Sequence, residues 1–335
     1  MSELTHALDA VAAEGGFSGV VRVDRADGVE LERAYGYAHR GWEIPNAPDT
    51  RFAVASATKG LTALTAVSLV EDGALALGTT ARSLLGDDLP LVGDEVTVEH
   101  LLAHRSGIGD YLDEDTDVDV SDYLMPVPAH ELAATEQYVA ALDGHPPKFA
   151  PDERFSYSNS GYVVLALLAE RASGTPFHEL VVQRVCEPAG MRDTAFLRSD
   201  ELPGRTALGY VEMDGAPRSN VFHLPARGSG DGGVYTTVAD VRALWTAFFA
   251  GRIVSPDWVR EMVRPRSDVP AHGKRYGLGF WLDASTDVVM LEGMDAGVSF
   301  LSKHDPGTNS TYTVVSNTTD GAWPVARLLD QRLRS

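Results

Sequence analysis

The spacing of apolar and polar residues predicts helices and strands in different parts of the chain. Residues 4–16, LTHALDAVAAEGG, carry apolar side chains at helical spacing and end at a glycine pair. Residues 17–39 contain two strand-forming runs around Ala-Asp-Gly, a sequence that favours a hairpin turn. A second helical pattern begins at Ser56, within RFAVASATKGLTALTAVSLVEDGALAL. The first 75 residues therefore read as helix, hairpin and helix.

Helical patterns dominate the middle of the chain, and strand patterns dominate its end. Middle segments such as TVEHLLAHRSG and GYVVLALLAERASG each close at a glycine, which is typical of a helix C-terminus. TTVADVRALWTAFFAG predicts one further helix. The later strand-like segments are YGLGFWLD, DVVMLEG, GVSFLSKHD and TYTVVSN, and WPVARLLDQRLR predicts a final helix.

This order predicts an α/β (α+β) fold with one antiparallel sheet built from both ends of the chain. Terminal helices are expected to cover the sheet, and the middle of the chain to form a mostly α-helical insertion. We expect a single domain over residues 1–335. Its α/β lobe would comprise about 1–75 and 226–335, and its helical lobe about 76–225.

Composition and charge limit the kinds of molecule that this chain is expected to bind. The net charge of −20 disfavours binding to nucleic acid or to anionic lipid, so a small molecule is the expected partner. The single cysteine, Cys186, excludes an internal disulfide and is expected to be a structural thiol. The chain shows neither a signal peptide nor an apolar run long enough to span a membrane, so we expect a cytoplasmic protein. The oligomeric state is left open.

Ser56 and Lys59 form the first candidate for chemistry. The chain has only four lysines, and Lys59 follows Ser56 by three residues, one helical turn away. A desolvated lysine at that spacing can accept the proton of a nucleophilic serine. The same S-x-x-K pattern also arises where the lysine is simply a solvated helix residue, so both interpretations stand at this point.

Tyr157 and Asn159 form the second candidate, in FSYSNSGY. A tyrosine phenol near a lysine can relay a proton to a leaving group, and an asparagine amide can bind a substrate carbonyl. The competing interpretation is a polar turn, since serine and asparagine favour turns.

Together these motifs resemble the serine β-lactamase and penicillin-recognising superfamily in its class C branch, which includes D-alanyl-D-alanine carboxypeptidases, D-aminopeptidases and family VIII carboxylesterases. Flanking phrases agree with the resemblance over about residues 17–320, including TVEHLLAHRSGI, EPAGMRDTAF and SGDGGVYTTVADV. The resemblance implies a β-lactamase-like fold. It also implies that Ser56 is the acylated nucleophile and Lys59 its base, that Tyr157 assists proton transfer, and that Asn159 contacts Lys59 and the substrate.

The third motif of that superfamily departs from its usual form here. The family carries K-T-G or H-x-G on a strand, and the matching segment is VVMLEGMDAGVSFLS. Alignment on Gly293 and Gly297 places Leu291 at the position of the cation and Glu292 beside it. The resemblance then implies that the backbone N–H groups of Ser56 and Met294 form the oxyanion hole. Arg227 or Arg275 is a possible source of the missing positive charge.

The other polar residues are expected to have structural rather than catalytic roles. His104 and Ser106 are expected at a helix end beside the site, and Asp152 as a turn residue where the family has glycine. An acidic run is expected to be a solvated loop rather than a cation site: Asp113, Glu114, Asp115, Asp117 and Asp119. His178, His223, His272 and His304 lack metal-ligand spacing, and no metal or cofactor is expected.

The sequence thus predicts a serine hydrolase that cleaves an ester or amide bond, with carboxylesterase activity on small neutral substrates as the first choice. D-amino-acid peptidase and weak β-lactamase activity are alternatives within that class. A non-catalytic member of the fold that binds an acyl group or peptide is the alternative of another class.

Overall fold

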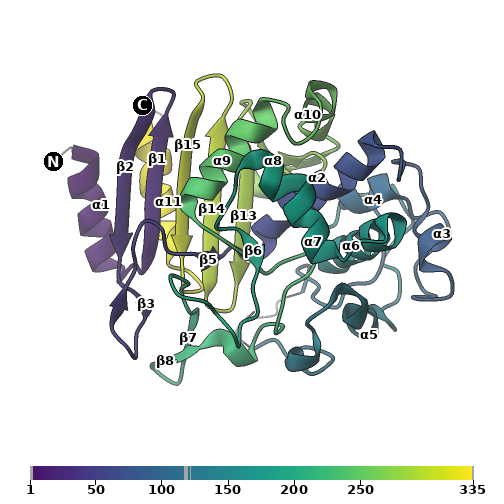
Figure 1. The fold of residues 1–335 in the computed structure, drawn as a ribbon, viewed down its shortest axis with the longest axis horizontal. Coiled ribbons are helices and arrows are strands. Elements are labelled where there is room, and N and C mark those ends of the chain that lie inside the picture. The colour runs from purple at the N-terminus through teal and green to yellow at the C-terminus, as the bar shows by residue number, and fades with distance from the viewer. Residues whose placement is uncertain (1–2, 117–119, 121, 334–335) are drawn as a thin grey trace.

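The computed structural model describes residues 3–116, 120 and 122–333. Its largest element is an antiparallel sheet of eight strands in the order β10-β11-β12-β13-β14-β15-β1-β2 (Figure 1). The strands are β1 Gly19–Arg25, β2 Gly28–Tyr35, β10 Ser267–Val269, β11 Lys274–Tyr276, β12 Trp281–Asp283, β13 Val289–Asp295, β14 Val298–Asp305 and β15 Ser310–Ser316. The N-terminal β1 pairs with the C-terminal β15, which confirms that both ends of the chain build this sheet.

Helices cover both faces of the sheet because its central strands carry apolar side chains on both faces. α1 (Glu3–Glu14) and α11 (Ala322–Leu333) pack together against one face, and α9 (Val238–Phe249) lies on the other (Figure 1). In the paired register, Val21 and Val314 belong to the cluster under α1 and α11, whereas Val20 and Val315 belong to the cluster on the opposite side. The period-two alternation of each strand thus divides its side chains between two cores.

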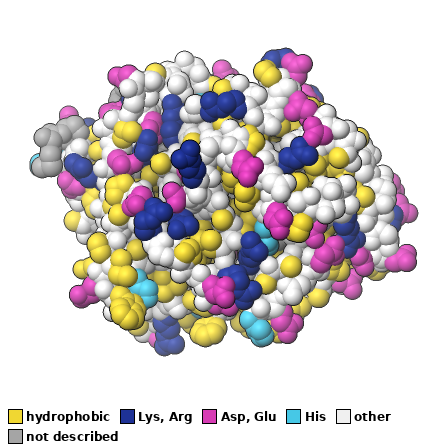
Figure 2. Space-filling model, in the orientation of Figure 1, with side chains coloured by type: hydrophobic (Ala, Val, Ile, Leu, Met, Phe, Trp, Pro, Cys, Tyr) yellow, Lys and Arg dark blue, Asp and Glu magenta, His cyan; other side chains and the backbone are white. Residues whose placement is uncertain are grey.

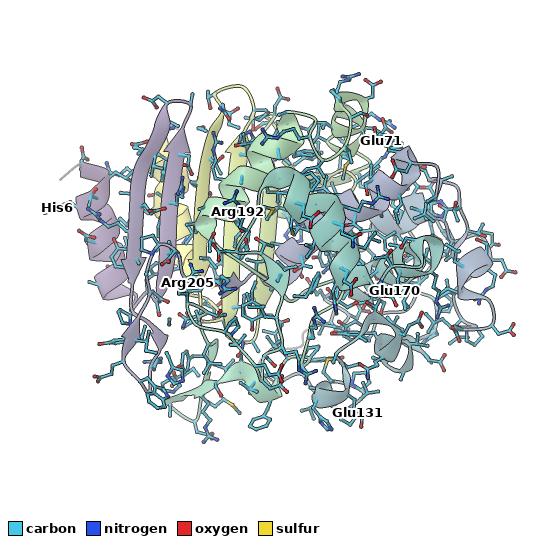
Figure 3. The ribbon with its side chains drawn as sticks, viewed as in Figure 1. His6, Glu71, Glu131, Glu170, Arg192 and Arg205 are labelled. Carbon is cyan, nitrogen blue, oxygen red and sulfur yellow. The ribbon has the colours of Figure 1, made fainter. Side chains whose placement is uncertain are left out.

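A helical region lies beside the sheet and contains the longest buried helices. Its centre is α2 (Thr58–Glu71), which packs against α6 (Asn159–Ser173). Glu170, labelled in Figure 3, extends from α6 and accepts a hydrogen bond of 2.7 Å from the backbone N–H of Phe177, which ties α6 to the next helix. The other α-helices are α3 Ala81–Leu85, α4 Val98–Leu102, α5 Val139–Leu142, α7 Phe177–Val181, α8 Glu187–Ala189 and α10 Pro256–Met262.

Short elements were harder to predict than the long ones. The short strands are β3 Tyr37–His39, β4 Ile44–Pro45, β5 Phe52–Ala53, β6 Ala195–Phe196, β7 Tyr210–Met213, β8 Ala216–Ser219 and β9 Val234–Thr236. The 3₁₀ and π turns are η1 Ala55–Ala57, η2 Ala129–Glu131, η3 Thr135–Tyr138, η4 Val182–Cys186, η5 Asn220–Phe222 and η6 Pro270–His272. Elements of two to five residues carry too few positions for a periodic pattern. The strand predicted over 276–283 is also wrong in detail, because it divides into the end of β11 and the whole of β12 around Gly279, whose φ is +88°.

On the face shown in Figure 2, acidic and basic side chains are interspersed. In the described part of the chain, no helix is both long and apolar enough to cross a membrane.

Candidate active site

Ser56 lies on a tight turn between α2 and a three-stranded sheet in the order β5-β9-β6. β5 pairs with β9, and the chain then enters η1, where Ala55 has a positive φ of +45°. The helical pattern that begins at Ser56 therefore starts as one 3₁₀ turn, and the α-helix proper begins at Thr58. A non-glycine residue at positive φ stores backbone strain and is frequent at functional sites.

Lys59 is buried beside Ser56, with only 2% of its surface exposed. Its Nζ donates to Ser56 Oγ at 3.0 Å, to Asn159 Oδ1 at 2.7 Å and to the backbone carbonyl of Asp231 at 2.8 Å. Burial lowers the pKa of the Lys59 ammonium, and the carboxylates of Asp231 and Glu114, in that order, oppose this change. The solvated-helix interpretation of Lys59 is therefore wrong.

Tyr157 forms one wall of the site within a group of aromatic rings. Its ring stacks on Trp281 at 5.9 Å with an interplanar angle of 7°, and lies 4.3 Å from the ring of His104. The Lys59 Nζ lies 4.8 Å from the Tyr157 ring centroid. Burial raises the pKa of Tyr157 well above its usual value, while a hydrogen bond with Ser56 opposes that rise. Tyr157 is therefore a neutral phenol near pH 7.

Asn159 is fixed at the N-terminus of α6. The Asp110 carboxylate accepts the backbone N–H groups of Asn159 at 2.8 Å and Ser160 at 3.0 Å. The Asn159 amide nitrogen donates to Leu112 O and to Glu114 Oε1. These two bonds leave the amide oxygen directed at Lys59. The sequence FSYSNSGY is thus a helix start rather than a simple polar turn.

Gly293 lets β13 pass close to the turn that carries Ser56. A Cβ at this position would lie 2.2 Å from Val54 O and 2.9 Å from Ser56 N, distances that no side chain tolerates. Met294 follows on the same strand and lines the same cavity as Ser56. The structure therefore brings the four motif residues Ser56, Lys59, Tyr157 and Asn159 together with Gly293 and Met294.

The predicted environment of the third motif is partly wrong. Leu291 is only 4% exposed and packs against the backbone at Gly60, so it belongs to the core and does not line the site. Glu292 does line the cavity, but it forms an ion pair with Lys274, whose ammonium also lies over the Trp281 ring at 5.1 Å. Lys274 stands on β11, two strands away from β13, so no motif spacing predicted this pair.

Arg227 and Arg275 do not supply the missing charge. Arg227 donates to the carbonyl of Phe196, and Arg275 donates to the carbonyl of Asp283. Neither arginine is among the residues that line the cavity.

His104 and Ser106 are buried beside the site, at the end of α4. His104 accepts the backbone N–H of Ser158 through Nδ1 at 3.0 Å and has a φ of +55°. Burial lowers the pKa of His104 well below its usual value, so it is a neutral packing residue. Asp152 has a φ of +67°, which explains why the family has glycine there.

Some of the remaining polar residues named in the sequence analysis line the cavity, and others lie away from it. Asp113 and Asp115 pair with Lys148, Glu114 lines the cavity, and Asp117 and Asp119 lie outside the described residues. His223 and His272 line the cavity, whereas His178 and His304 bond to Gly228 O and Thr311 Oγ1 elsewhere. Cys186 is buried, and burial raises the pKa of its thiol to about 12. Among the described residues, no group of three or more His, Cys, Asp or Glu is arranged to hold a metal.

A cavity of about 630 Å³ opens over Ser56 and is rich in acidic groups. Its carboxylates are Glu114, Asp115, Asp231, Glu292 and Asp295. Five residues that line the cavity could not be identified from the sequence patterns: Tyr111, Asp231, Lys274, Trp281 and Asp295. Asp231 had a local signal, since it stands before the glycine pair in the matched phrase SGDGGVYTT, and Asp295 lies within the third-motif segment VVMLEGMDAGVSFLS.

Comparison with known proteins identifies the family of this chain and several relatives. A family model described as Beta-lactamase matches residues 4–334. The chain is 31% identical over 300 residues to Esterase EstB from Burkholderia gladioli, covering 80% of this chain and 75% of that protein. It is 27% identical over 271 residues to the Putative penicillin-binding protein PbpX from Bacillus subtilis (strain 168), covering 80% of this chain. The chain spans 63% of the length of that relative and 42% of Penicillin-binding protein 4* from the same strain.

Solved structures share the fold over nearly the whole chain. A penicillin binding protein from Bacillus halodurans superposes with a TM-score of 0.91 at 31% identity, covering 97% of this chain and 99% of that one. The D-amino acid amidase from Ochrobactrum anthropi SV3, complexed with L-phenylalanine amide, has a TM-score of 0.79 at 24% identity and covers all of both chains. At that identity the amidase supports the β-lactamase-like fold alone.

Proposed function

This chain belongs to the Beta-lactamase family, and we propose that it is a serine hydrolase that cleaves small, uncharged esters or amides through an acyl-enzyme on Ser56. The family includes esterases and penicillin-binding proteins, so hydrolase chemistry is what its members share. Carboxylesterase activity is the form that the site of this chain supports best.

The observation that carries the proposal is the state of Lys59. Its amine lies 3.0 Å from Ser56 Oγ, and burial lowers its pKa. Among the described residues, its side chain forms no ion pair with a carboxylate, only hydrogen bonds to neutral oxygens. Burial of a lysine that has no directly bonded carboxylate favours the neutral amine, the form that a general base requires, and it outweighs the charges of Asp231 and Glu114.

The proposed reaction follows from these positions. The Ser56 hydroxyl attacks the substrate carbonyl while its proton passes to the neutral Lys59 amine, and the carbonyl oxygen becomes an oxyanion. The backbone N–H groups of Ser56 and Met294 would bind that oxyanion. The Tyr157 phenol, kept protonated by burial, passes a proton to the leaving group and is reprotonated from Lys59. Water then attacks the acyl-enzyme, and Ser56 recovers its proton.

The preference for an uncharged substrate comes from the charges around the cavity. Lys274 is neutralised by Glu292, so it offers no unpaired cation to a substrate carboxylate. Glu114 and Asp231 add negative charge on the other walls, and Asp295 adds a further carboxyl group. A carboxylate such as that of a penicillin or a peptide C-terminus would meet like charges there, which disfavours binding.

One preparation of the protein tests the proposal against its alternatives. We expect p-nitrophenyl butyrate to be hydrolysed with a higher kcat/KM than a chromogenic cephalosporin or a D-amino-acid amide. Cephalosporin turnover equal to or above that of the ester would instead support β-lactamase activity, and a faster amide would support a peptidase.

Ser56→Ala tests the nucleophile directly. The variant should lose both hydrolysis and the mass adduct that a fluorophosphonate leaves on the wild-type protein. Ser285→Ala, at an exposed turn, is the matched control and should retain both. A wild-type protein that forms no adduct on Ser56 would favour a non-catalytic acyl- or peptide-binding role.

A further inference from the structure

Tyr157 stands on a segment that is neither helix nor strand. It lies just before α6, which begins at Asn159. In the proposed reaction its phenol oxygen must stay within hydrogen-bond reach of the leaving group that departs from Ser56. The side chains that pack around the Tyr157 ring therefore decide where its hydroxyl points.

The rings of Trp281 and His104 pack against Tyr157, and the Trp281 ring is almost parallel to it. The centroids of Trp281 and Tyr157 are 5.9 Å apart, with an interplanar angle of 7°. The His104 ring lies 4.3 Å from Tyr157 at an angle of 32°. Offset stacking is one of the preferred geometries of aromatic pairs, so a tilt of the Tyr157 ring would weaken its contact with Trp281.

Trp281 is itself held by the large sheet. It stands on β12, where its backbone pairs with Tyr276 on β11 and with Met290 on β13. The Tyr276 ring meets the indole edge-on, at 4.9 Å and 89°, and the Phe155 ring meets it at 5.9 Å and 61°. A side chain on a rigid strand is placed more precisely than one on a loop, so Trp281 can pass the order of the sheet to Tyr157.

The ion pair of Lys274 and Glu292 anchors the indole of Trp281. Lys274 stands on β11 and Glu292 on β13, the two neighbours of β12, so the pair crosses over the strand that carries Trp281. The Lys274 Nζ lies 5.1 Å from the centroid of the indole. A cation over a tryptophan ring is attracted to it, and more strongly where both are partly removed from water. This arrangement gives the ion pair a role other than substrate binding.

We propose that Trp281, anchored by Lys274, is a positioning residue that holds the Tyr157 phenol in the orientation from which it protonates the leaving group. The inference rests on the proposed function, because it assigns a supporting role within the same reaction. In that step the proton leaves the Tyr157 oxygen for the leaving oxygen or nitrogen and is replaced from the Lys59 ammonium, so no further reactant is required.

The alternative role for Trp281 is an apolar wall that only contacts the substrate. The two roles differ in which substrates depend on the residue. A wall affects all esters of similar shape alike, whereas a positioning residue for Tyr157 matters only where the leaving group needs a proton. The dependence of the rate on the leaving group therefore separates the two roles.

The test uses the p-nitrophenyl, p-chlorophenyl and p-methylphenyl esters of butyrate, whose leaving phenols are progressively less acidic. Trp281→Leu should lower kcat/KM about 10- to 100-fold for the p-methylphenyl ester, the scale expected when a catalytic group is misplaced. It should lower kcat/KM less than about threefold for the p-nitrophenyl ester, because p-nitrophenolate departs without a proton. An equal loss for all three esters would overturn the inference.

Further variants connect the leaving-group dependence with the stacked rings. Trp281→Phe keeps a flat ring and should restore the wild-type dependence. Lys274→Met keeps the indole but removes its anchor, so it should change the dependence in the same direction by a smaller amount, and it replaces Trp281→Leu if that variant fails to fold. Trp323→Leu removes an indole from another wall of the cavity and should leave the dependence as in the wild-type protein.

A double variant tests whether Trp281 acts through Tyr157. In the Tyr157→Phe background there is no phenol to orient, so the addition of Trp281→Leu should not steepen the leaving-group dependence further. Additive effects of the two substitutions would show that Trp281 acts independently of Tyr157 and would overturn the inference.

A spectroscopic measurement separates this inference from the proposed function. Tyrosine labelled with ¹³C at Cζ gives one resonance for Tyr157, identified by its loss in Tyr157→Phe. That resonance should be single and narrow in the wild-type protein and in Trp281→Phe, and broadened or divided in Trp281→Leu. If the wild-type protein hydrolyses the esters but Trp281→Leu changes neither the resonance width nor the leaving-group dependence, the positioning role fails alone. If Ser56 reacts with neither ester nor fluorophosphonate, the proposed function fails, and the resonance still decides whether Trp281 holds Tyr157.

Discussion

Replacement of Asp295 by asparagine should stabilise the protein against unfolding by a larger amount at alkaline pH than at mildly acidic pH. Burial raises the pKa of this carboxyl group from 3.8 to about 7. Between these two values the native state binds a proton that the unfolded chain has already released. A rise in pH therefore favours unfolding, and the stability that the protonated group provides is lost as the pH passes through about 7.

The magnitude follows from that change in pKa. The full effect above pH 7 corresponds to at most about 4 kcal/mol in the free energy of unfolding. About 2 kcal/mol of it falls between pH 5.5 and pH 8.5. Since the Asp295 side chain is only partly buried, water reduces the effect further. We therefore expect Asp295→Asn to raise the free energy of unfolding by about 1 kcal/mol more at pH 8.5 than at pH 5.5.

Urea denaturation at these two pH values measures the difference, and both lie above the pI of about 4.8. Asp115→Asn is the control. A hydrogen bond with Lys148 lowers the pKa of Asp115, so its carboxylate is ionised in both the native and the unfolded states throughout this range. Its substitution should change stability by the same amount at each pH. An equal effect of Asp295→Asn at the two values, or a greater loss of stability at pH 8.5, would refute the reasoning.

Three further predictions concern the reaction. Lys59→Ala should lower kcat/KM for p-nitrophenyl butyrate by about 10²- to 10⁴-fold, and a much smaller loss would identify Tyr157 or water as the base. In the wild-type protein, kcat/KM should rise with pH, with a midpoint below the usual lysine pKa of about 10.4, because burial lowers the pKa of Lys59. Tyr157→Phe should impair hydrolysis of a butyranilide more than that of p-nitrophenyl butyrate, because p-nitrophenolate departs without a proton; equal losses would contradict a proton relay. Gly293→Ala should abolish fluorophosphonate labelling of Ser56, because the added Cβ would lie 2.2 Å from Val54 O and displace β13. The control is Gly215→Ala at an exposed turn, which should be labelled normally. Because Gly215 has a φ of +75°, this control variant should lose some stability against unfolding.

The long elements of the fold could be predicted from local pattern. The helix at α1, the hairpin of β1 and β2 and the three strands β13, β14 and β15 all carry enough residues for their periodicity to be read. The sheet built from both termini followed from their order along the chain. The strands β5, β6 and β9 could not be read in this way, because two or three residues contain no period and are strands only through their partners.

The motif residues were also accessible from the sequence. Ser56 and Lys59 are one turn apart on the same segment, so local geometry alone brings them together. Tyr157 and Asn159 joined them through the resemblance of two phrases about 100 residues apart. What no spacing revealed was the state of these groups, since burial by α6 and by the loop of Asp231 sets the pKa of Lys59.

The charges around the site were decided by tertiary structure alone. The sequence placed Leu291 and Glu292 at the third motif, but the pleat of β13 turns Leu291 into the core and Glu292 toward Lys274. Lys274 reaches that position because β11 and β12 complete the sheet beside β13. Asp231 and Asp295 are 64 residues apart in the printed numbering and meet only where two loops converge beside Ser56. Local sequence determines which chemical groups are available, and the packing of distant segments determines their charge, their partners and the cavity that they share.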